Sequence, residues 1–128
     1  MDNEQLNQTS ELIIGAAIKI HTRLGAGLLE NVYKTCLAHE LRAAGQMVIS
    51  ELVVPIRYEN LKLDGGYRVD LLINDTIVVE IKAVEKVLSV HYAQVLTYLR
   101  LLDKRLGLLI NFNVPRLVLG VKRIVNNF

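Results

Sequence analysis

The sequence predicts a mixed domain of the α/β or α+β class, in which helices flank a β-sheet. Two amphipathic helical segments open the chain, three alternating strand segments follow, and one more helical segment precedes two further strand segments. The predicted order is therefore ααβββαββ. A helix that joins the third strand to the fourth indicates a right-handed crossover into a mixed sheet with helices on its faces.

The length and composition bound the possibilities. With 128 residues the chain can form one domain, residues 1–128, around a single core. The hydrophobic fraction is 52%, yet no apolar run approaches the roughly 18 residues of a membrane span. The surplus therefore belongs to a core or to a subunit interface, which leaves a homodimer open. The polar start "DNEQLNQTSE" does not resemble a signal peptide, and Cys36 is the only cysteine, so we expect a cytoplasmic protein without a membrane partner.

The first two elements are predicted helices. Residues 9–24 have apolar residues at helical spacing, with Thr9 or Ser10 as the N-cap and Gly25 as the stop. Residues 28–44 repeat the pattern and end at Gly45. Both helices present one apolar stripe to a core.

The remaining elements are strands around a third helix. From residue 47 the chain becomes β-branched and alternating, and residues 47–58, 61–73 and 76–84 predict an antiparallel meander. Ser89 can cap a helix over residues 90–104. Two further strands, 106–113 and 117–125, are separated by a segment that contains Pro115.

Three charges lie in the most apolar part of the chain. Asp70, Glu80 and Lys82 are surrounded by Val, Leu and Ile in "YRVDLLINDTIVVEIKAV", residues 67–84. Charges in such a setting are costly unless they are paired or bind a metal. The predicted hairpin between these strands decides whether the three charges can meet.

Strand alternation distinguishes two registers for that hairpin. A loop of Asn74 and Asp75 would pair Asp70 with Val79 and mix charges with aliphatics on both faces. A three-residue loop, residues 74–76, instead pairs Asp70 with Glu80, and we prefer it. This register also pairs Arg68 with Lys82 and Leu72 with Val78, and it leaves one apolar face composed of Val69, Leu71, Ile73, Ile77, Val79 and Ile81.

The preferred register indicates metal-dependent hydrolysis. Two adjacent carboxylates repel each other unless one is protonated or a cation lies between them. Mg²⁺ binds few protein oxygens, keeps several waters and leaves positions for a phosphate oxygen and an attacking water. Lys82 lies on the same face as Glu80 and can orient that water or offset charge on phosphorus. The structural alternative is a strand with a Glu80–Lys82 ion pair and a solvated Asp70.

The predicted helices contribute further polar residues. "GLLENVY" in the second helix contains Gly27, Glu30 and Tyr33, and "QVLTY" in the third contains Gln94 and Tyr98 at i and i+4. Together with the three charged strand residues, this set resembles the PD-(D/E)XK nuclease superfamily. Within it, "GLLENVY" is similar to the motif of the GxxExxY protein family.

The resemblance covers nearly the whole chain and implies a restriction-endonuclease-like fold. It implies that Mg²⁺ or Mn²⁺ is held by Asp70, Glu80 and the carbonyl of Ile81, with Glu30 completing the site. It also implies that Lys82 acts at the attacking water and that Gln94 positions water or phosphate, supported by Tyr98. The proline of the superfamily's name is absent, because Val69 precedes Asp70.

Other residues are secondary candidates. Tyr33 is expected in the core with its hydroxyl near the site, Gly27 is expected to serve backbone geometry, and His91 shares the face of Gln94 and is a supporting candidate for contact with phosphate. Cys36 and His39 are three apart, but no second pair completes a zinc site.

The sequence therefore predicts a Mg²⁺- or Mn²⁺-dependent nuclease that acts on nucleic acid, with DNA as the favoured substrate. The net charge of +2 is too small to indicate nucleic acid by itself. The alternative is an accessory domain that binds nucleic acid or a protein partner and keeps the nuclease fold without turnover.

Overall fold

The computed structural model describes all residues, 1–128. The chain forms three α-helices, one short 3₁₀ helix and seven strands. In chain order the elements are α1 (Asn3–Leu24), α2 (Glu30–Ala43), β1 (Val48–Val53), β2 (Ile56–Tyr58), β3 (Leu61–Leu63), β4 (Arg68–Ile73), β5 (Ile77–Lys82), α3 (Ser89–Leu102), β6 (Leu106–Asn111), η1 (Leu117–Gly120) and β7 (Val121–Val125).

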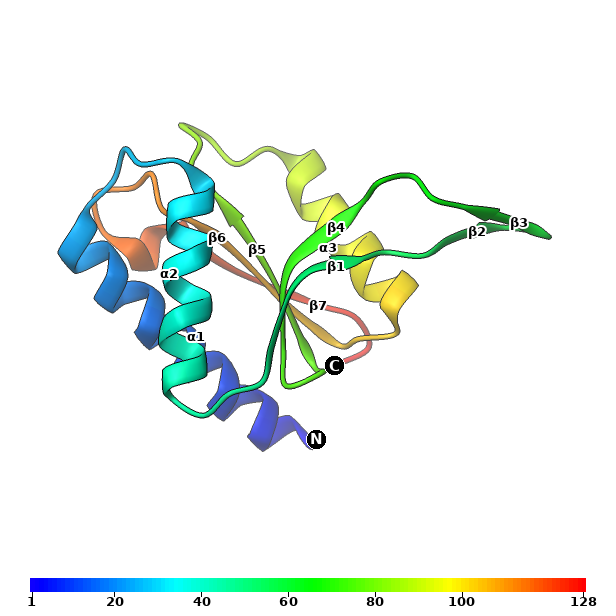
Figure 1. The fold of residues 1–128 in the computed structure, drawn as a ribbon, viewed down its shortest axis with the longest axis horizontal. Helices are drawn as coiled ribbons and strands as arrows, with labels where there is room; N and C mark the ends of the chain where they lie inside the picture. The colour runs from blue at the N-terminus through cyan, green and yellow to red at the C-terminus, as the bar shows by residue number, and fades with distance from the viewer.

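Five of the strands form one mixed sheet. Its order is β1-β4-β5-β6-β7, and only the β5–β6 pair is parallel. The helix α3 connects these two strands, as a crossover between parallel neighbours requires (Figure 1). The mixed sheet, the meander and the crossover predicted from the sequence are thereby confirmed.

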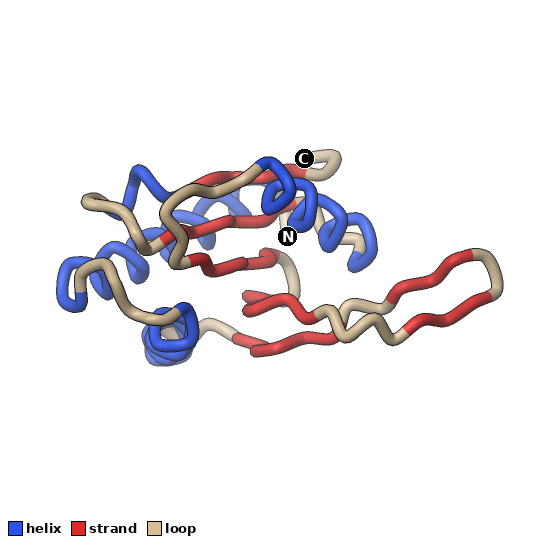
Figure 2. Tube along the Cα trace, turned by 90° about the horizontal axis from the view of Figure 1, so that it is seen from above, coloured by secondary structure: helices blue, strands red, loops and turns tan.

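Two predicted strands are each divided in the structure. The outer parts of residues 47–58 and 61–73 become β2 and β3, which form a separate two-stranded hairpin that projects from the body (Figure 2). Pro55 has no N–H for a ladder bond and separates β1 from β2. Gly66 adopts a left-handed φ of 74° and helps to separate β3 from β4. The last predicted strand likewise begins with the 3₁₀ turn η1.

The predicted helix starts were wrong at two places. α1 begins at Asn3 because Asp2 caps it: the Asp2 carboxylate accepts from Gln5 N at 2.8 Å, and the Gln5 side chain accepts from Asp2 N at 2.9 Å. In α3 the N-cap is Leu88, and Ser89 is already helical. The side chain of His91 accepts from Leu88 N there.

The two faces of the sheet have different covers. α1 and α2 pack on one face around a core cluster of 18 buried residues, in which Tyr33 stacks on Phe112 with ring centroids 4.3 Å apart. α3 lies on the other face (Figure 1) and contributes Val95, Tyr98 and Leu99 to a smaller cluster of 8 buried residues. None of the helices combines the length and apolar character needed to cross a membrane.

Val69 does not lie with the apolar face predicted for it. It packs with Leu72 and Val78 in the smaller cluster, whereas Leu71 belongs to the larger one. The backbone is irregular at this point, because Glu51 in β1 has a left-handed φ of 56° and the β1–β4 pairing skips from Ser50–Leu71 to Leu52–Val69. Regular alternation therefore ends at Asp70.

The contact between α3 and β6 makes a testable prediction. A Cβ at Gly107 would lie 2.8 Å from Cγ1 of Val95, a β-branched side chain with little freedom to move. We expect Gly107→Ala to lower the free energy of unfolding by about 1–3 kcal/mol, measured by urea denaturation. The matched control is Gly15→Ala in α1, where a Cβ meets nothing within 4 Å. This variant should raise the free energy of unfolding by about 0.5–1 kcal/mol. Equal stability of the two variants would contradict this packing.

Candidate active site where β4 begins and β5 ends

The hairpin register brings Asp70 and Glu80 together. Leu72 pairs with Val78 and Ile73 with Ile77, so the loop has the three residues predicted from the sequence. Asn74 and Asp75 in this loop have left-handed φ values of 52° and 56°, which Asn and Asp tolerate. Continued by two positions, the same register sets Asp70 opposite Glu80.

At this point the carboxyl groups replace backbone partners. Asp70 N donates to Glu80 Oε1 at 2.8 Å, and Ile81 N donates to Asp70 Oδ2 at 2.8 Å. The regular β4–β5 ladder ends just before, at Leu71 and Val79. Each carboxyl thus satisfies a main-chain donor of the opposite strand, which fixes both side chains across the two strands.

The electrostatics of this pair are unfavourable for two negative charges. Burial is the main cause that raises the pKa of Glu80 to about 8, and the Asp70 carboxylate is the second cause. Burial also raises the pKa of Asp70, although the hydrogen bond from Ile81 and the charges of Lys34 and Lys82 oppose the shift. Near neutral pH the Glu80 carboxyl therefore holds a proton in the protein without a cation.

Lys82 is half-buried at the end of β5 and forms no ion pair. The structural alternative required a Glu80–Lys82 ion pair and a solvated Asp70. Neither feature is present, because Asp70 is half-buried and the ammonium of Lys82 has no carboxylate within 4.0 Å. The amine therefore remains available beside the two carboxyl groups.

Glu30 approaches the same end of β5 from the other side of the sheet. It is the first residue of α2, and its Oε2 accepts from Ala83 N at 3.4 Å. The loop before it is held by Tyr33, whose hydroxyl donates to Gly25 O at 2.6 Å and accepts from Leu28 N at 3.1 Å. Gly27 has a φ of 99°, as the prediction of a backbone role for it required. These contacts fix the start of α2 and hence hold Glu30 at the end of β5.

The helix α3 supplies Tyr98 and Gln94. Tyr98 is buried beneath the carboxyl pair, where burial first and the charge of Glu80 second raise the pKa of its hydroxyl to about 12. Gln94 lies one turn earlier, half-buried, and its amide makes no hydrogen bond within the protein. Tyr98 thus borders the site, and the amide of Gln94 is free to bind a ligand.

Two supporting candidates have structural contacts instead. The Nδ1 atom of His91 accepts from Leu88 N at 3.0 Å and so caps the start of α3. The ring of Tyr33 is buried in the larger core, and its hydroxyl is used by the loop between α1 and α2. Neither side chain forms a hydrogen bond with Asp70 or Glu80.

Sequence reasoning missed three residues around the site. Lys34 forms an ion pair with Glu51, and Glu51 lies in β1 between the residues that pair with Leu71 and Val69, the two neighbours of Asp70. Tyr67 packs against Tyr98 with ring centroids 6.4 Å apart. The i+4 spacing from Glu30 was a signal for Lys34. Glu51 had no such signal, because only the pairing of β1 with β4 places it.

The oxygen donors fit a hard divalent cation by their chemistry, although the acids do not converge as a cluster. No group of three Asp, Glu, His or Cys side chains lies close enough to hold a metal ion. Asp70 Oδ1 and Glu80 Oε2 accept no hydrogen bond and are not sealed from solvent. These two oxygens, from carboxyl groups that lack a countercharge, are suitable ligands for Mg²⁺ or Mn²⁺.

Comparison with known proteins gives one match. The family model described as the PD-(D/E)XK nuclease superfamily matches residues 7–124. No curated protein and no solved structure matches the chain.

The raised pKa of Glu80 predicts a pH-dependent loss of stability. The group titrates near 4.5 when unfolded and near pH 8 when folded, so the native state holds a proton that the unfolded state has lost. The contribution of this bound proton to the free energy of unfolding is complete below pH 4.5. It falls as the pH rises to about 8, at a rate of up to about 1.4 kcal/mol per pH unit. In chelator, Glu80→Gln should therefore become more stable than wild type as the pH rises from about 5 to about 8.

Urea denaturation at the two pH values measures this difference. Glu80→Gln keeps an oxygen that can accept from Asp70 N, so the variant removes the titration and retains the hydrogen bond. The control is Glu40→Gln, because a hydrogen bond from Lys19 lowers the pKa of Glu40. At the higher pH, Glu40→Gln should gain no stability relative to wild type. A pH-independent difference between wild type and Glu80→Gln would refute the assignment.

Proposed function

The chain belongs to the PD-(D/E)XK nuclease superfamily, and on that premise we propose that it hydrolyses phosphodiester bonds of nucleic acid, DNA in particular, in the presence of Mg²⁺ or Mn²⁺. A nuclease-like function in general follows from the superfamily. The observation that carries the finer proposal is the Asp70–Glu80 pair, with its crossed hydrogen bonds and the unpaired amine of Lys82 beside it.

The metal would be held by Asp70, Glu80 and the carbonyl oxygen of Ile81, with Glu30 as a further ligand. When bound, such an ion polarises a phosphoryl oxygen and lowers the pKa of a coordinated water. The raised pKa values of the two carboxyl groups support this assignment, because a cation would remove the repulsion that burial intensifies. Glu30 is exposed and lies at Ala83 N, next to the end of β5 that carries the proposed ligands.

The other residues of the site bind and orient the attacking water and the phosphate. The ammonium of Lys82 orients the attacking water and offsets the charge that develops on the phosphate. The free amide of Gln94 hydrogen-bonds to water or to a phosphate oxygen. Tyr98 stays neutral because its pKa is about 12, so its hydroxyl can act as a hydrogen-bond donor at the carboxyl pair.

We also propose that the chain is a member of the GxxExxY family. The support is structural: Gly27 provides the positive φ, Tyr33 fastens the loop, and Glu30 reaches the end of β5. Each position of the motif therefore has a separate physical task in setting one carboxylate at the site.

The accessory function remains the second candidate, and one observation favours it. The three carboxyl groups do not converge at metal-binding distance. A protein that binds nucleic acid or a protein partner without turnover would need no such convergence. Metal binding and cleavage therefore have to be tested separately.

Calorimetric titration with Mn²⁺ tests the ligands. Wild type should bind Mn²⁺, and Asp70→Asn should weaken this binding by more than about tenfold, because a neutral amide removes one anionic ligand. Asp75→Asn is the matched control, since Asp75 is exposed in the neighbouring loop and pairs with Lys104. An affinity unchanged in Asp70→Asn would remove Asp70 from the metal site.

Cleavage of labelled DNA and RNA, single-stranded and duplex, tests the reaction. Wild type should cut in Mg²⁺ or Mn²⁺ and not in chelator, and Lys82→Met should lower the rate by about 10²–10⁴-fold. Lys122→Met on β7, an exposed lysine on the far strand, should cut at the wild-type rate. Equal cutting by Lys82→Met would indicate a contaminant, and metal binding without any cutting would support the accessory function.

A further inference from the structure

No contact of the β2–β3 hairpin explains why the fold would need it. It extends away from the sheet (Figure 2), and its two strands pack extensively only against each other. An isolated two-stranded hairpin is marginally stable in water. Five strands already form the sheet without it, which suggests that the hairpin is kept for binding.

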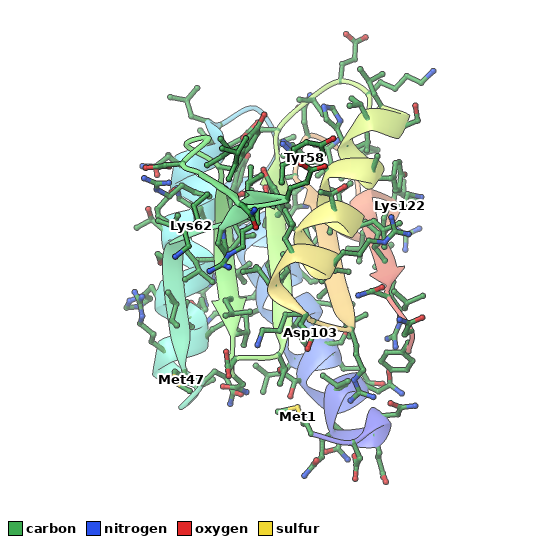
Figure 3. All side chains as sticks on the ribbon, turned by 90° about the vertical axis from the view of Figure 1, so that its right-hand side faces the viewer. Met1, Met47, Tyr58, Lys62, Asp103 and Lys122 are labelled. Atoms are coloured by element: carbon green, nitrogen blue, oxygen red, sulfur yellow. The ribbon has the colours of Figure 1, made fainter.

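The register gives the hairpin two unlike faces. Arg57 pairs with Lys62, so two cations lie directly opposite each other on one face. Tyr58 pairs with Leu61 on the other face, and these two side chains are 64% and 59% exposed. Figure 3 shows Lys62 and Tyr58 pointing to opposite sides of the hairpin.

The Arg57–Lys62 pair opposes folding. Like charges directly across an antiparallel pair are destabilising, and no acid forms an ion pair with either residue. The two acids of the hairpin are used elsewhere: Glu59 lies in the tip turn, and Asp64 accepts from Gly66 N at 3.1 Å. A polyanion that contacts both cations would remove the repulsion.

The hairpin is also joined directly to the site. β3 leads into β4, and Asp70 follows Lys62 by eight residues, a span of at most about 26 Å at about 3.3 Å per residue. In a duplex this is the length of about eight base pairs at 3.4 Å each. One nucleic-acid molecule of that length can therefore contact both the cations and the carboxyl pair.

We propose that the β2–β3 hairpin is an arm that binds nucleic acid, with Arg57 and Lys62 on the phosphate backbone. The identity of the polyanion rests on the proposed function. Tyr58, on the opposite face, adds an exposed aromatic surface for contact with sugars or bases. The arm supplies affinity at a distance from the site, and the residues of the site do the chemistry.

The test measures binding of a fluorescent duplex of about 24 base pairs by anisotropy in chelator, at several salt concentrations. Arg57→Ala/Lys62→Ala should weaken binding and reduce the slope of log K against log salt by about 2, one for each lost phosphate contact. The matched control is Arg116→Ala/Lys122→Ala, which removes the same charge from the residue before η1 and from β7; Lys122 lies well away from Lys62 (Figure 3). The control should keep the wild-type slope.

Urea denaturation provides a second readout. Because the two cations repel each other, Arg57→Ala/Lys62→Ala should be as stable as wild type or more stable, whereas a structural role would lower its stability. Equal salt slopes in wild type and the arm variant would overturn the proposal, as would a wild type that binds no nucleic acid.

Other results separate the arm from the proposed function. Wild-type binding that depends on the arm, without cleavage in any metal, would refute the nuclease and leave the arm intact. A wild-type dimer that Tyr58→Ala/Leu61→Ala converts to a monomer, with unchanged affinity for the duplex, would show that the hairpin joins two copies of the chain and would overturn the arm.

Discussion

The facing carboxyl groups of Asp70 and Glu80 are the constraint on which the rest of the structure depends. Desolvation makes them costly, and each is held by a main-chain N–H of the opposite strand, so neither can move away without leaving a donor unpaired. The regular ladder ends beside them, and the smaller core under α3 begins there, with Val69 turned toward it. A local electrostatic cost is thus maintained by the packing of two strands and a helix, which is the usual condition of a functional site.

The two faces of the sheet each position a different part of this site. The larger core holds α2, and Tyr33 connects that core to the loop before the helix by stacking on Phe112 and bonding Gly25 and Leu28. Glu30 is consequently presented at the end of β5 by rigid elements. The smaller core holds α3 so that Tyr98 lies under the carboxyl pair. The packed residues of the two cores therefore determine where the polar groups lie, and Gly27, Glu30 and Tyr33 each have a part in this arrangement.

Much of this arrangement could be predicted because strand alternation is strict where one face is buried. Only a three-residue loop separates charges from aliphatics in the β4–β5 hairpin, and the structure has that loop. The prediction failed where that constraint was absent. β2 and β3 lie outside the sheet and are exposed, so no buried face distinguished them from β1 and β4. The position of Glu51 could not be predicted, because Glu51 itself adopts a left-handed φ inside a strand. Strand propensities do not indicate such a conformation. The start of α1 was missed because its capping box, Asp2 and Gln5, lies in a polar segment without apolar periodicity.

Charge explains why chemistry and affinity would be separated in this molecule. Asp70 and Glu80 lie beside the unpaired Lys82, Glu30 adds a third carboxyl group at the end of β5, and Lys34 is already paired with Glu51. Such a site repels phosphate until a cation or a proton neutralises it. The net charge of +2 is too small to overcome that repulsion over the whole surface. For the proposed function, cations that bind the nucleic-acid backbone would therefore lie away from the carboxyl pair, yet within the length of one substrate. Arg57 and Lys62 meet both conditions, and an anion that contacts both would relieve the repulsion between them.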